Sequence, residues 1–330
     1  MTIFVKCGNI SSMENADDLY EKALAAQKVG NKSQAIEYFN EASNLYGELE
    51  DWDKYYRCAK ASADLDDPEG WRKLGNCYNY GYVVQQDYQQ AVYWYKKAAE
   101  HGIAQAQSNL GYCYMEGNGV YQSPQQAVCW WKKAAEQGFA DAQYNLGNAY
   151  SKGEGVQQSY QQAVSWYKKA AEQDHAKAQY NLGCCYAEGK GARQNFESAV
   201  YWWKKAAEQG NVEAQCNLAK SYNFGKGVEQ NDGQAFYWYK RAAEQGHTHS
   251  QSCVAYSYAN GEGVEQDYEQ AVYWWKKAAE QGDAGSQFNL GACYANGDGV
   301  PQSNSEARYW FKKAAANGFM DAQIMLEKLK

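Results

Sequence analysis

The sequence predicts an all-α protein, a solenoid of stacked helix-turn-helix repeats, and three observations support this. An apolar residue within a recurring motif falls every 36 residues, at positions 74, 110, 146, 182, 218, 254, 290 and 326. Each repeat contains two segments with the apolar periodicity of a helix. The 330 residues include only three prolines, and proline breaks helix interiors. A fixed period of roughly 20–50 residues is the signature of a stacked array.

The segment that precedes the repeats predicts a helical hairpin followed by a third helix. Ala16–Val29 and Ser33–Tyr46 have helical patterns on either side of a Gly30-Asn31 turn, and residues 51–64 form another such segment. The hairpin resembles a tetratricopeptide repeat at Gly30, Ala35, Phe39 and Ala42. We interpret residues 1–66 as a tetratricopeptide-like cap that covers the exposed end of the stack, which solenoids need. A separate docking module is the alternative.

Seven full repeats occupy residues 67–318, and residues 319–330 begin an eighth that we expect to form a C-terminal capping helix. In the first helix of a repeat, Ala106, Leu110 and Tyr114 lie at i, i+4 and i+8 and therefore share one face. This face is expected to pack against the second helix.

The second helix of each repeat has clear boundaries. Its start carries side chains that accept hydrogen bonds from free backbone N–H groups, namely Asp87, Ser123, Ser159, Asn195, Asn231, Asp267 and Ser303. Its end carries a residue suited to a left-handed cap, namely Gly102, Gly138, Asp174, Gly210, Gly246, Gly282 and Gly318. Between them, a Trp such as Trp94 is expected to fill the space between layers, and a Lys-Lys pair such as Lys96 and Lys97 is expected to face solvent.

A glycine-rich loop joins the two helices of a repeat. It reads Gly117-Asn-Gly-Val120 in one repeat, and five later repeats also have Gly-x-Gly followed by Val or Ala, whereas the first repeat has Gly81-Tyr-Val-Val84. The glycines permit positive φ angles, and the valine is expected to pack against the core. Nucleotide binding is disfavoured because the loop follows a helix rather than a strand and lacks a third glycine.

The motifs of this repeat resemble the Sel1-like repeat family, which is related to the tetratricopeptide repeats. In chain order they are Ala-x-x-x-Leu-Gly-x-x-Tyr, Gly-x-Gly-Val and Ala-Val-x-Trp-x-Lys-Lys-Ala-Ala-Glu-x-Gly. The resemblance covers residues 67–330. It implies a right-handed α-α superhelix of antiparallel helix pairs that scaffolds protein complexes. One branch of the family joins the second helix to the next helix through a disulfide, but the corresponding positions here, such as Ala135 and Gln143, are not cysteine. This departure favours a reducing compartment.

The composition disfavours nucleic acid and membranes as partners. The formal net charge is −7 and the isoelectric point is about 5.3, so the chain lacks a basic footprint for polyanions. No run approaches the roughly 20 apolar residues of a spanning helix. Too few apolar residues precede Lys6 for a secretory signal, and Cys7 lacks the context of a lipid anchor. Ten cysteines without a C-x-x-C pair are expected to be reduced thiols in the cytoplasm.

No residue is assigned a catalytic, cofactor-binding or metal-binding role. His247 and His249 flank a turn, but a metal site needs three or four converging ligands and the sequence indicates no others. Cys184 and Cys185 are adjacent, so they do not face the same side of a helix as a redox pair would. The sequence predicts a protein that is not an enzyme and that uses no cofactor.

Comparison among the repeats selects a candidate partner-binding stripe on the first helices. Positions that are fixed in every repeat serve stacking, whereas variable positions on an exposed face are free to encode a partner. Two variable positions lie four residues apart and therefore on one face of the first helix. They hold Tyr80, Tyr112, Glu116, Asn148, Lys152, Glu188, Lys220, Phe224, Tyr256 and Asn260. By family resemblance, first helices line the inner, concave surface. The aromatic members are the expected anchors, and sequence drift on an unused surface is the alternative.

The predicted function is a scaffold or adaptor, expected to be a monomer, that holds a protein or peptide in the inner groove. A rigid stack lowers the ordering entropy that binding costs. Two alternatives come from other classes: a hydrolase of cell-wall or β-lactam substrates, as in cysteine-rich relatives, and a secreted effector that binds a host protein. The hydrolase would need an export signal, disulfides and a nucleophile, and the sequence shows none of them.

Overall fold

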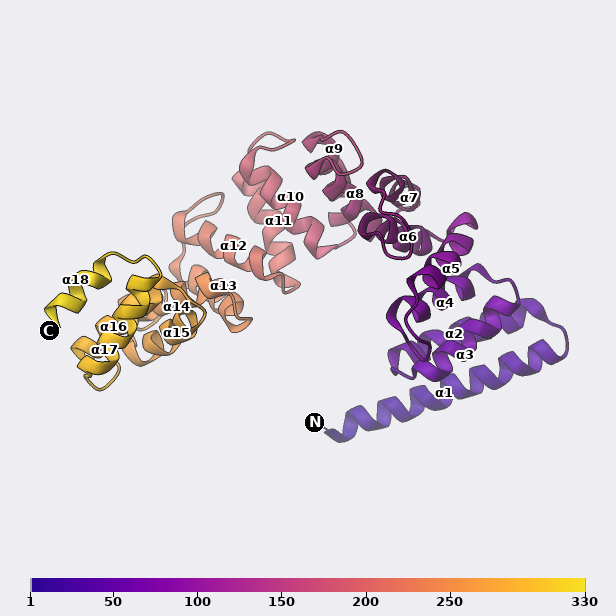
Figure 1. The fold of residues 1–330 in the computed structure, drawn as a ribbon, viewed down its shortest axis with the longest axis horizontal. Helices are drawn as coiled ribbons and strands as arrows, with labels where there is room; N and C mark the ends of the chain where they lie inside the picture. Colours follow the sequence, from indigo (N-terminus) through magenta and orange to yellow (C-terminus); the bar gives the residue numbers. More distant parts are fainter. Residues whose placement is uncertain (1, 330) are drawn as a thin grey trace. The chain divides into compact units, whose positions relative to one another are not determined.

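The computed structural model describes residues 2–329, with side chains from residue 11 onward. Over these residues the chain forms 18 helices and no strand, which confirms the predicted all-α repeat solenoid (Figure 1). Three helices precede the repeats, namely α1 (Thr2–Lys28), α2 (Lys32–Glu48) and α3 (Trp52–Asp64). The first helices of the repeats are α4 (Pro68–Tyr80), α6 (Ala104–Glu116), α8 (Ala140–Lys152), α10 (Ala176–Glu188), α12 (Val212–Phe224), α14 (Thr248–Asn260) and α16 (Ala284–Asn296). The second helices are α5 (Tyr88–Glu100), α7 (Pro124–Glu136), α9 (Tyr160–Ala171), α11 (Phe196–Glu208), α13 (Asp232–Glu244), α15 (Tyr268–Glu280) and α17 (Asn304–Ala316), and α18 (Asp321–Lys328) ends the chain.

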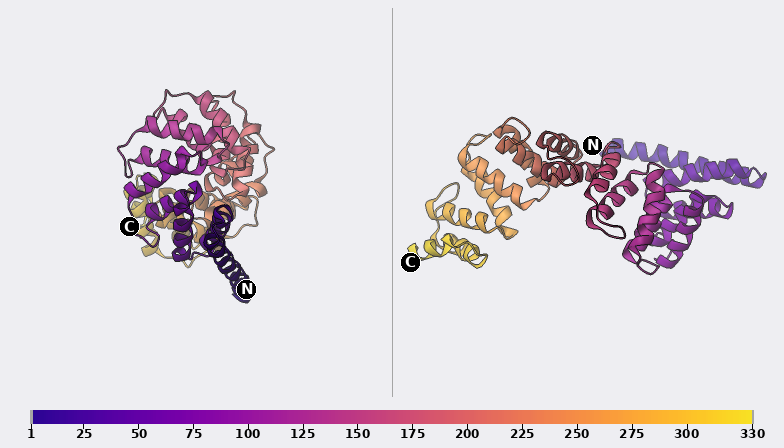
Figure 2. Two further views of the ribbon diagram at one scale, coloured as in Figure 1. Left: turned by 90° about the vertical axis from the view of Figure 1, so that its right-hand side faces the viewer. Right: turned by 90° about the horizontal axis from the view of Figure 1, so that it is seen from above.

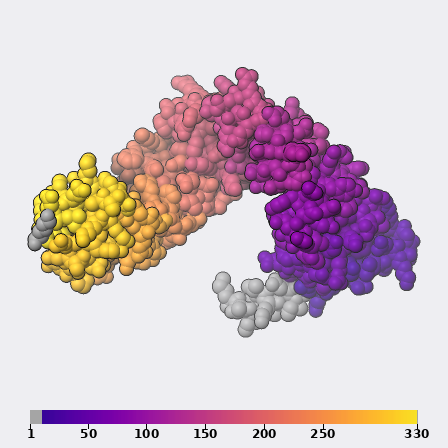
Figure 3. Space-filling model, in the orientation of Figure 1, coloured from indigo at the N-terminus to yellow at the C-terminus, as the bar shows by residue number. Residues whose placement is uncertain are grey.

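The chain forms two compact bodies, an N-terminal body of Met1–Ala170 and a C-terminal body of Ala171–Lys330. From α1 to α8 in the first body, and from α10 to α18 in the second, each helix packs against the next helix in the chain. Figure 2 shows these successive helices in two further views, and Figure 3 shows the chain in space-filling form. Contacts between nearest neighbours are the pattern of a solenoid.

The helices α2 and α3 lie where the sequence predicts them and begin at the N-caps Asn31 and Asp51. The first helix ends as predicted but begins at Thr2 rather than at Ala16. The indole of Trp52 stacks on the ring of Tyr82, in the loop after α4, with centroids 4.0 Å apart. This contact fastens α3 to the first repeat. The cap role of residues 1–66 stays a prediction.

The C-terminal helix α18 lies within the predicted segment 319–330. Its role as a cap also stays a prediction. Met1 and Lys330, which end the two predicted caps, lie outside the described residues.

The boundaries predicted for the second helices are confirmed. Each predicted N-cap side chain accepts a hydrogen bond from a backbone N–H group two or three residues later. Each predicted terminal residue has a positive φ angle, including Asp174 at 59°. These local signals fix where each helix begins and ends.

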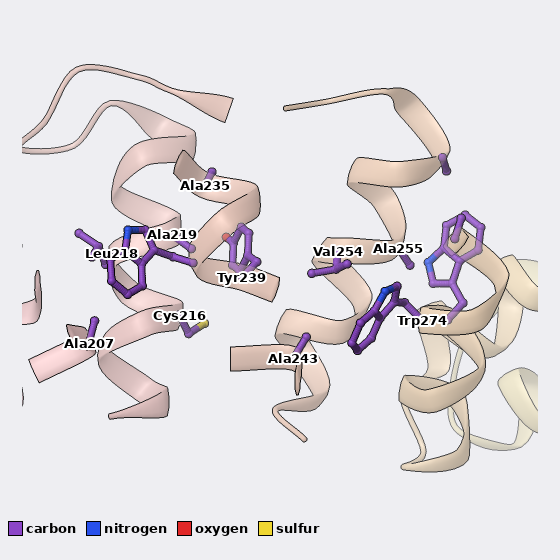
Figure 4. Packing of buried hydrophobic residues seen from close by; sticks show 14 of the residues in the cluster. Ala207, Cys216, Leu218, Ala219, Ala235, Tyr239, Ala243, Val254, Ala255 and Trp274 are labelled. Atoms are coloured by element: carbon purple, nitrogen blue, oxygen red, sulfur yellow. The ribbon is translucent and has the colours of Figure 1, made fainter. Parts of the chain in front are cut away.

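The core of a repeat forms where a small residue of the first helix meets an aromatic ring of the second. A Cβ atom at Gly111 would lie 2.5 Å from the indole of Trp131, which explains why this position holds Gly, or Ala as at Ala219. The aromatic ring is buried in every repeat, at Tyr95, Trp131, Tyr167, Trp203, Tyr239, Trp275 and Phe311. Figure 4 shows this packing in the C-terminal body, where Ala219 and Tyr239 belong to one cluster.

The preceding Trp, which the sequence predicts to be the interlayer residue, is less uniformly buried. Trp94 and Trp166 are half-buried at the edge of their clusters, whereas Trp274 is buried. The residue after the Trp therefore contributes the more consistent core side chain, because its ring is directed between the helices.

A buried glutamine joins successive repeats, and the sequence interpretation missed it. The side-chain amide of Gln107 donates to the backbone oxygen of Ala99, at the end of the previous second helix (3.1 Å). Its Oε1 accepts from Nε2 of Gln137, at the end of its own repeat (2.8 Å). The bond to the preceding helix recurs at Gln143, Gln179, Gln215, Gln251 and Gln287.

The glycine-rich loops lie against the previous repeat. A Cβ atom at Gly119 would lie 2.2 Å from the carbonyl oxygen of Tyr88, so the second glycine permits a close backbone contact. In the repeat that begins at residue 67, Val83 takes the place of the second glycine and is exposed with a φ of 64°. The loop valines are partly buried against the core, as predicted, at Val120, Val156, Val228 and Val300.

Candidate protein-interaction surface

The stripe predicted on the first helices lies at the surface in each body. Its aromatic side chains are 61%, 54%, 65% and 45% exposed at Tyr80, Tyr112, Phe224 and Tyr256, respectively. Of its polar members, four are exposed, namely Glu116, Lys152, Glu188 and Asn260, and two are half-buried, namely Asn148 and Lys220. The stripe is therefore accessible, and its partner-binding role stays a prediction.

One member of the stripe has a packing role that accounts for its identity. Oδ1 of Asn148 accepts a hydrogen bond from the hydroxyl of the buried Tyr167 (2.7 Å), as Asn76 does from Tyr95 two repeats earlier (2.9 Å). Because a buried hydroxyl needs a partner, Tyr at the core position favours Asn at the stripe position. The variation at Asn148 thus reflects the core as well as the surface.

Tyr256 is held in place although almost half of it is exposed. Its hydroxyl accepts a hydrogen bond from Nδ2 of Asn289 (2.7 Å), and its ring meets the indole of Trp275 edge to face, with centroids 5.6 Å apart. An aromatic side chain that is already ordered loses little entropy on binding, which suits an anchor.

Two charged members of the stripe are paired with residues of their own loops. Lys152 lies 3.7 Å from Glu154, and Glu188 lies 2.6 Å from Lys190. Since exposed pairs of this kind contribute little stability, they mainly neutralise the local surface.

Two pockets open beside the stripe in the C-terminal body. One, of about 220 Å³, is lined by residues that include Phe196, Lys220 and Phe224. The other, of about 190 Å³, is lined by residues that include Tyr256 and Glu262. Both are small, so each has room for a side chain rather than for a large ligand.

The Sel1 repeat profile matches eight segments of the chain, at residues 18–46, 72–103, 104–139, 140–175, 176–211, 212–247, 250–283 and 284–319. These segments make up most of the sequence. The chain belongs to the Sel1 repeat family. The first match lies in α1 and α2, so the N-terminal hairpin also has the Sel1 pattern.

Solved Sel1 repeat structures are similar to this chain over most of its length. A Sel1 repeat protein from Oxalobacter formigenes is 30% identical, with a TM-score of 0.66, over 94% of this chain and 90% of that one. A protective antigen present in uropathogenic Escherichia coli strains, which displays an SLR fold, is 31% identical, with a TM-score of 0.61, over 95% of this chain and 82% of that one. A search of curated proteins found no match. Sel1 repeat proteins generally act as protein-interaction scaffolds and are typically non-catalytic.

The second helices of the Sel1 repeats expose aromatic residues that the sequence interpretation also missed. Tyr309 is about half exposed and packs edge to face on Trp310, and Nζ of Lys313 lies 4.7 Å and 5.1 Å from the two ring centroids. The same triad recurs at Tyr201, Tyr237 and Tyr273, with Arg replacing Lys after Tyr237. The second Lys of each Lys-Lys pair thus covers a Trp. This Lys follows that Trp by three residues in the sequence, and the spacing could have indicated the contact.

The histidines of the Sel1 repeats mostly serve the fold. Nδ1 of His247 accepts from the backbone N–H of Ser250 (3.2 Å), and His175 caps α10 in the same way. His249 lies 3.6 Å from the Cys253 thiol. Burial lowers the pKa of His249, aided by the nearby Lys220, and burial raises the pKa of Cys253 to about 11. The pair is therefore a neutral imidazole and a protonated thiol at neutral pH.

The helices and the ionisable side chains were also compared with the requirements of a membrane span and of a metal site. No helix formed by residues 2–329 is long and apolar enough to cross a membrane. Among the side chains described, no group of three or more His, Cys, Asp and Glu residues is arranged to hold a metal ion.

Proposed function

We propose that this Sel1 repeat protein is a non-catalytic scaffold that holds a segment of a partner protein against its first-helix stripe. The supporting observation is that exposed aromatic side chains occupy positions that vary from repeat to repeat, while the stacking positions beside them stay fixed. Exposed aromatics are the side chains that most often dominate protein interfaces. In this proposal the protein is a cytoplasmic monomer.

Partner capture with matched variants tests the scaffold. Wild-type protein, Tyr112→Ala and Tyr256→Ala would capture partners from a lysate of the source organism, and the affinity of each captured protein would then be measured in purified form by calorimetry. Tyr121→Ala is the matched control, because Tyr121 is 98% exposed on the loop after α6 and is not a member of the stripe. We expect at least one stripe variant to weaken binding by about tenfold or more, and the control to bind like wild type.

Two results would count against this function. Equal affinities of wild type and both stripe variants would show that the partner binds elsewhere. If wild type captured no partner at all, the scaffold itself would be wrong.

The hydrolase alternative gains no support from the chemistry of the surface. A catalytic cysteine needs its thiolate form, which an adjacent base or a lowered pKa provides. Cys253 has a raised pKa although His249 is close. The pair is therefore unsuited to nucleophilic attack at neutral pH.

A further inference from the structure

The pocket beside Phe224 combines apolar walls with two lysines. It lies in the C-terminal body, where α11 contributes Phe196 and Trp203, α12 contributes Lys220 and Phe224, and the loop after α12 contributes Lys226. Its volume of about 220 Å³ is below the roughly 300–1,000 Å³ of pockets for small molecules. A single side chain of a larger partner is the occupant that fits this size.

The lysines of this pocket lack the acidic neighbours that other repeats provide. Lys190, one repeat before Lys226, pairs with Glu188, but Phe224 takes the place of that glutamate in the α12 repeat. Nζ of Lys226 instead lies 5.9 Å from the ring centroid of Phe196. Over residues 11–329, no ion pair joins Lys220 or Lys226 to a carboxylate.

The fold does not require these residues. The positions that correspond to Lys220 in the neighbouring repeats hold Cys184 and Tyr256, and the position that corresponds to Lys226 in the next repeat holds Glu262. The same helix pairs form in all three repeats. The combination of Phe224 with two lysines that pair with no carboxylate is therefore a property of this one surface.

The local charge is opposite to that of the whole chain. The formal net charge of the chain is −7. Near the pocket, however, the positive charge of Lys220 lowers the pKa of His249 on α14, in addition to the larger effect of burial. A basic patch with apolar walls in an acidic protein attracts a carboxylate while the rest of the surface repels it.

We propose that this pocket binds an acidic segment of a partner protein, with an apolar side chain between Phe196, Trp203 and Phe224 and an adjacent carboxylate paired with Lys220 and Lys226. The inference rests on the proposed scaffold function and names the chemistry of its partner. Hydrogen bonds between ammonium and carboxylate groups are about twice as strong as neutral ones. The segment thus gains affinity from the apolar contact and specificity from the charge.

Peptide selection tests the pocket before any partner has been identified. A random dodecapeptide display library would be selected on the wild-type chain, on Lys220→Gln/Lys226→Gln, and on the control Lys22→Gln/Lys32→Gln. The control removes two lysines of α1 and α2 that lie outside the stripe and already pair with carboxylates. We expect wild type and control to select peptides with Asp or Glu beside an aromatic or aliphatic residue, and the pocket variant to lose them. Thermal unfolding would confirm that all three chains fold.

The most enriched peptide then gives a quantitative measurement by fluorescence anisotropy. We expect its affinity to fall about tenfold in Lys220→Gln/Lys226→Gln and in Phe224→Ala, and to be retained in Lys220→Arg/Lys226→Arg. Replacing the peptide's carboxylates by amides is expected to cause the same loss on wild type, because the charge-assisted bonds then disappear.

Three outcomes would contradict the proposed role of the pocket. They are the absence of selected peptides, selected peptides without acidic residues, and equal binding by wild type and Lys220→Gln/Lys226→Gln. None of them contradicts the scaffold, which fails only if the wild-type protein captures no partner from the lysate. The two proposals can therefore fail separately.

Discussion

Lys73 is an ionisable residue placed inside the protein rather than on its surface. It is 1% exposed, and its Nζ donates to the backbone oxygen of Asn40 at 3.0 Å and contacts the hydroxyl of Ser43. Burial lowers the pKa of its ammonium group to about 8, against the attraction of Glu69. The residue connects α4 to α2 through polar contacts whose strength depends on its protonation.

The pH dependence of stability provides a test of this residue. Because the pKa of Lys73 is lower in the folded chain than in the unfolded one, the unfolded state binds more protons between about pH 8 and 10.5, and its contribution to stability rises with pH there. We expect the free energy of unfolding of wild type, minus that of Lys73→Met, to increase by about 1–2 kcal/mol from pH 7 to 9.5. Urea denaturation at several pH values measures this difference.

Subtracting the free energy of unfolding of Lys73→Met from that of wild type removes the contribution of titrating cysteines and tyrosines, which is common to both proteins. A difference that stays constant over this range would mean that Lys73 titrates like an exposed lysine.

The buried glutamine is the device that connects one helix pair to the next. Gln215 is fully buried, donates to the backbone oxygen of Ala207 at 3.0 Å, and accepts from Gln245 at 2.9 Å. It thus gives a second donor to a carbonyl in the last turn of α11, which also accepts from the backbone N–H of Gly210 at 3.0 Å. Trp71 takes this role in the first repeat, where its indole N–H donates to the oxygen of Ala63 at 3.2 Å.

Replacing this glutamine at constant volume tests the connection. Gln215→Met removes both hydrogen bonds, each with a net contribution of about 0.5–1.5 kcal/mol, so we expect a loss of about 1–3 kcal/mol of stability. Gln245→Met, at the exposed end of the same pair, removes the bond to Gln215 and a longer, exposed bond to the backbone oxygen of Arg241 (3.4 Å), and it is expected to cost clearly less. Equal and small losses in the two variants, measured by urea denaturation, would show that the buried bonds contribute little.

The whole molecule is built from contacts between neighbouring helices, so its stability is expected to be close to a sum over repeats. Within the C-terminal body, each second helix contacts the first helix of its own repeat and that of the next one. The surface features differ in kind from this framework, because the stripe and the pocket use positions that neighbouring repeats fill with other residues.

Deleting one complete repeat tests whether the stability of the chain is a sum over its repeats. Removal of residues 248–283 joins His247 to Ala284 and keeps the register, so we expect a shorter protein with the same helical ellipticity per residue and a lower Tm. Removal of residues 248–265 eliminates α14 and most of the loop after it and leaves α15 without the first helix of its own repeat, so cooperative unfolding should be lost. If both deletions behaved alike by circular dichroism, the repeat would not be the unit of stability.

The sequence by itself determined the repeat period, the boundaries of the second helices and the positions of the variable stripe. These depend on signals within a few residues, such as the N-cap of Asp87, the left-handed end at Asp174 and the spacing of apolar residues. The family followed from the same motifs.

The tertiary structure decided which side chains meet across helices. It paired Asn148 with Tyr167 across 19 residues and Gln107 with Gln137 across 30, and it placed the second Lys of each pair over a Trp. It also brought Phe196 and Lys226 to one pocket with Phe224. Such contacts depend on how two helices pack, and the periodicity of a single helix specifies its buried face but not the partner of each side chain.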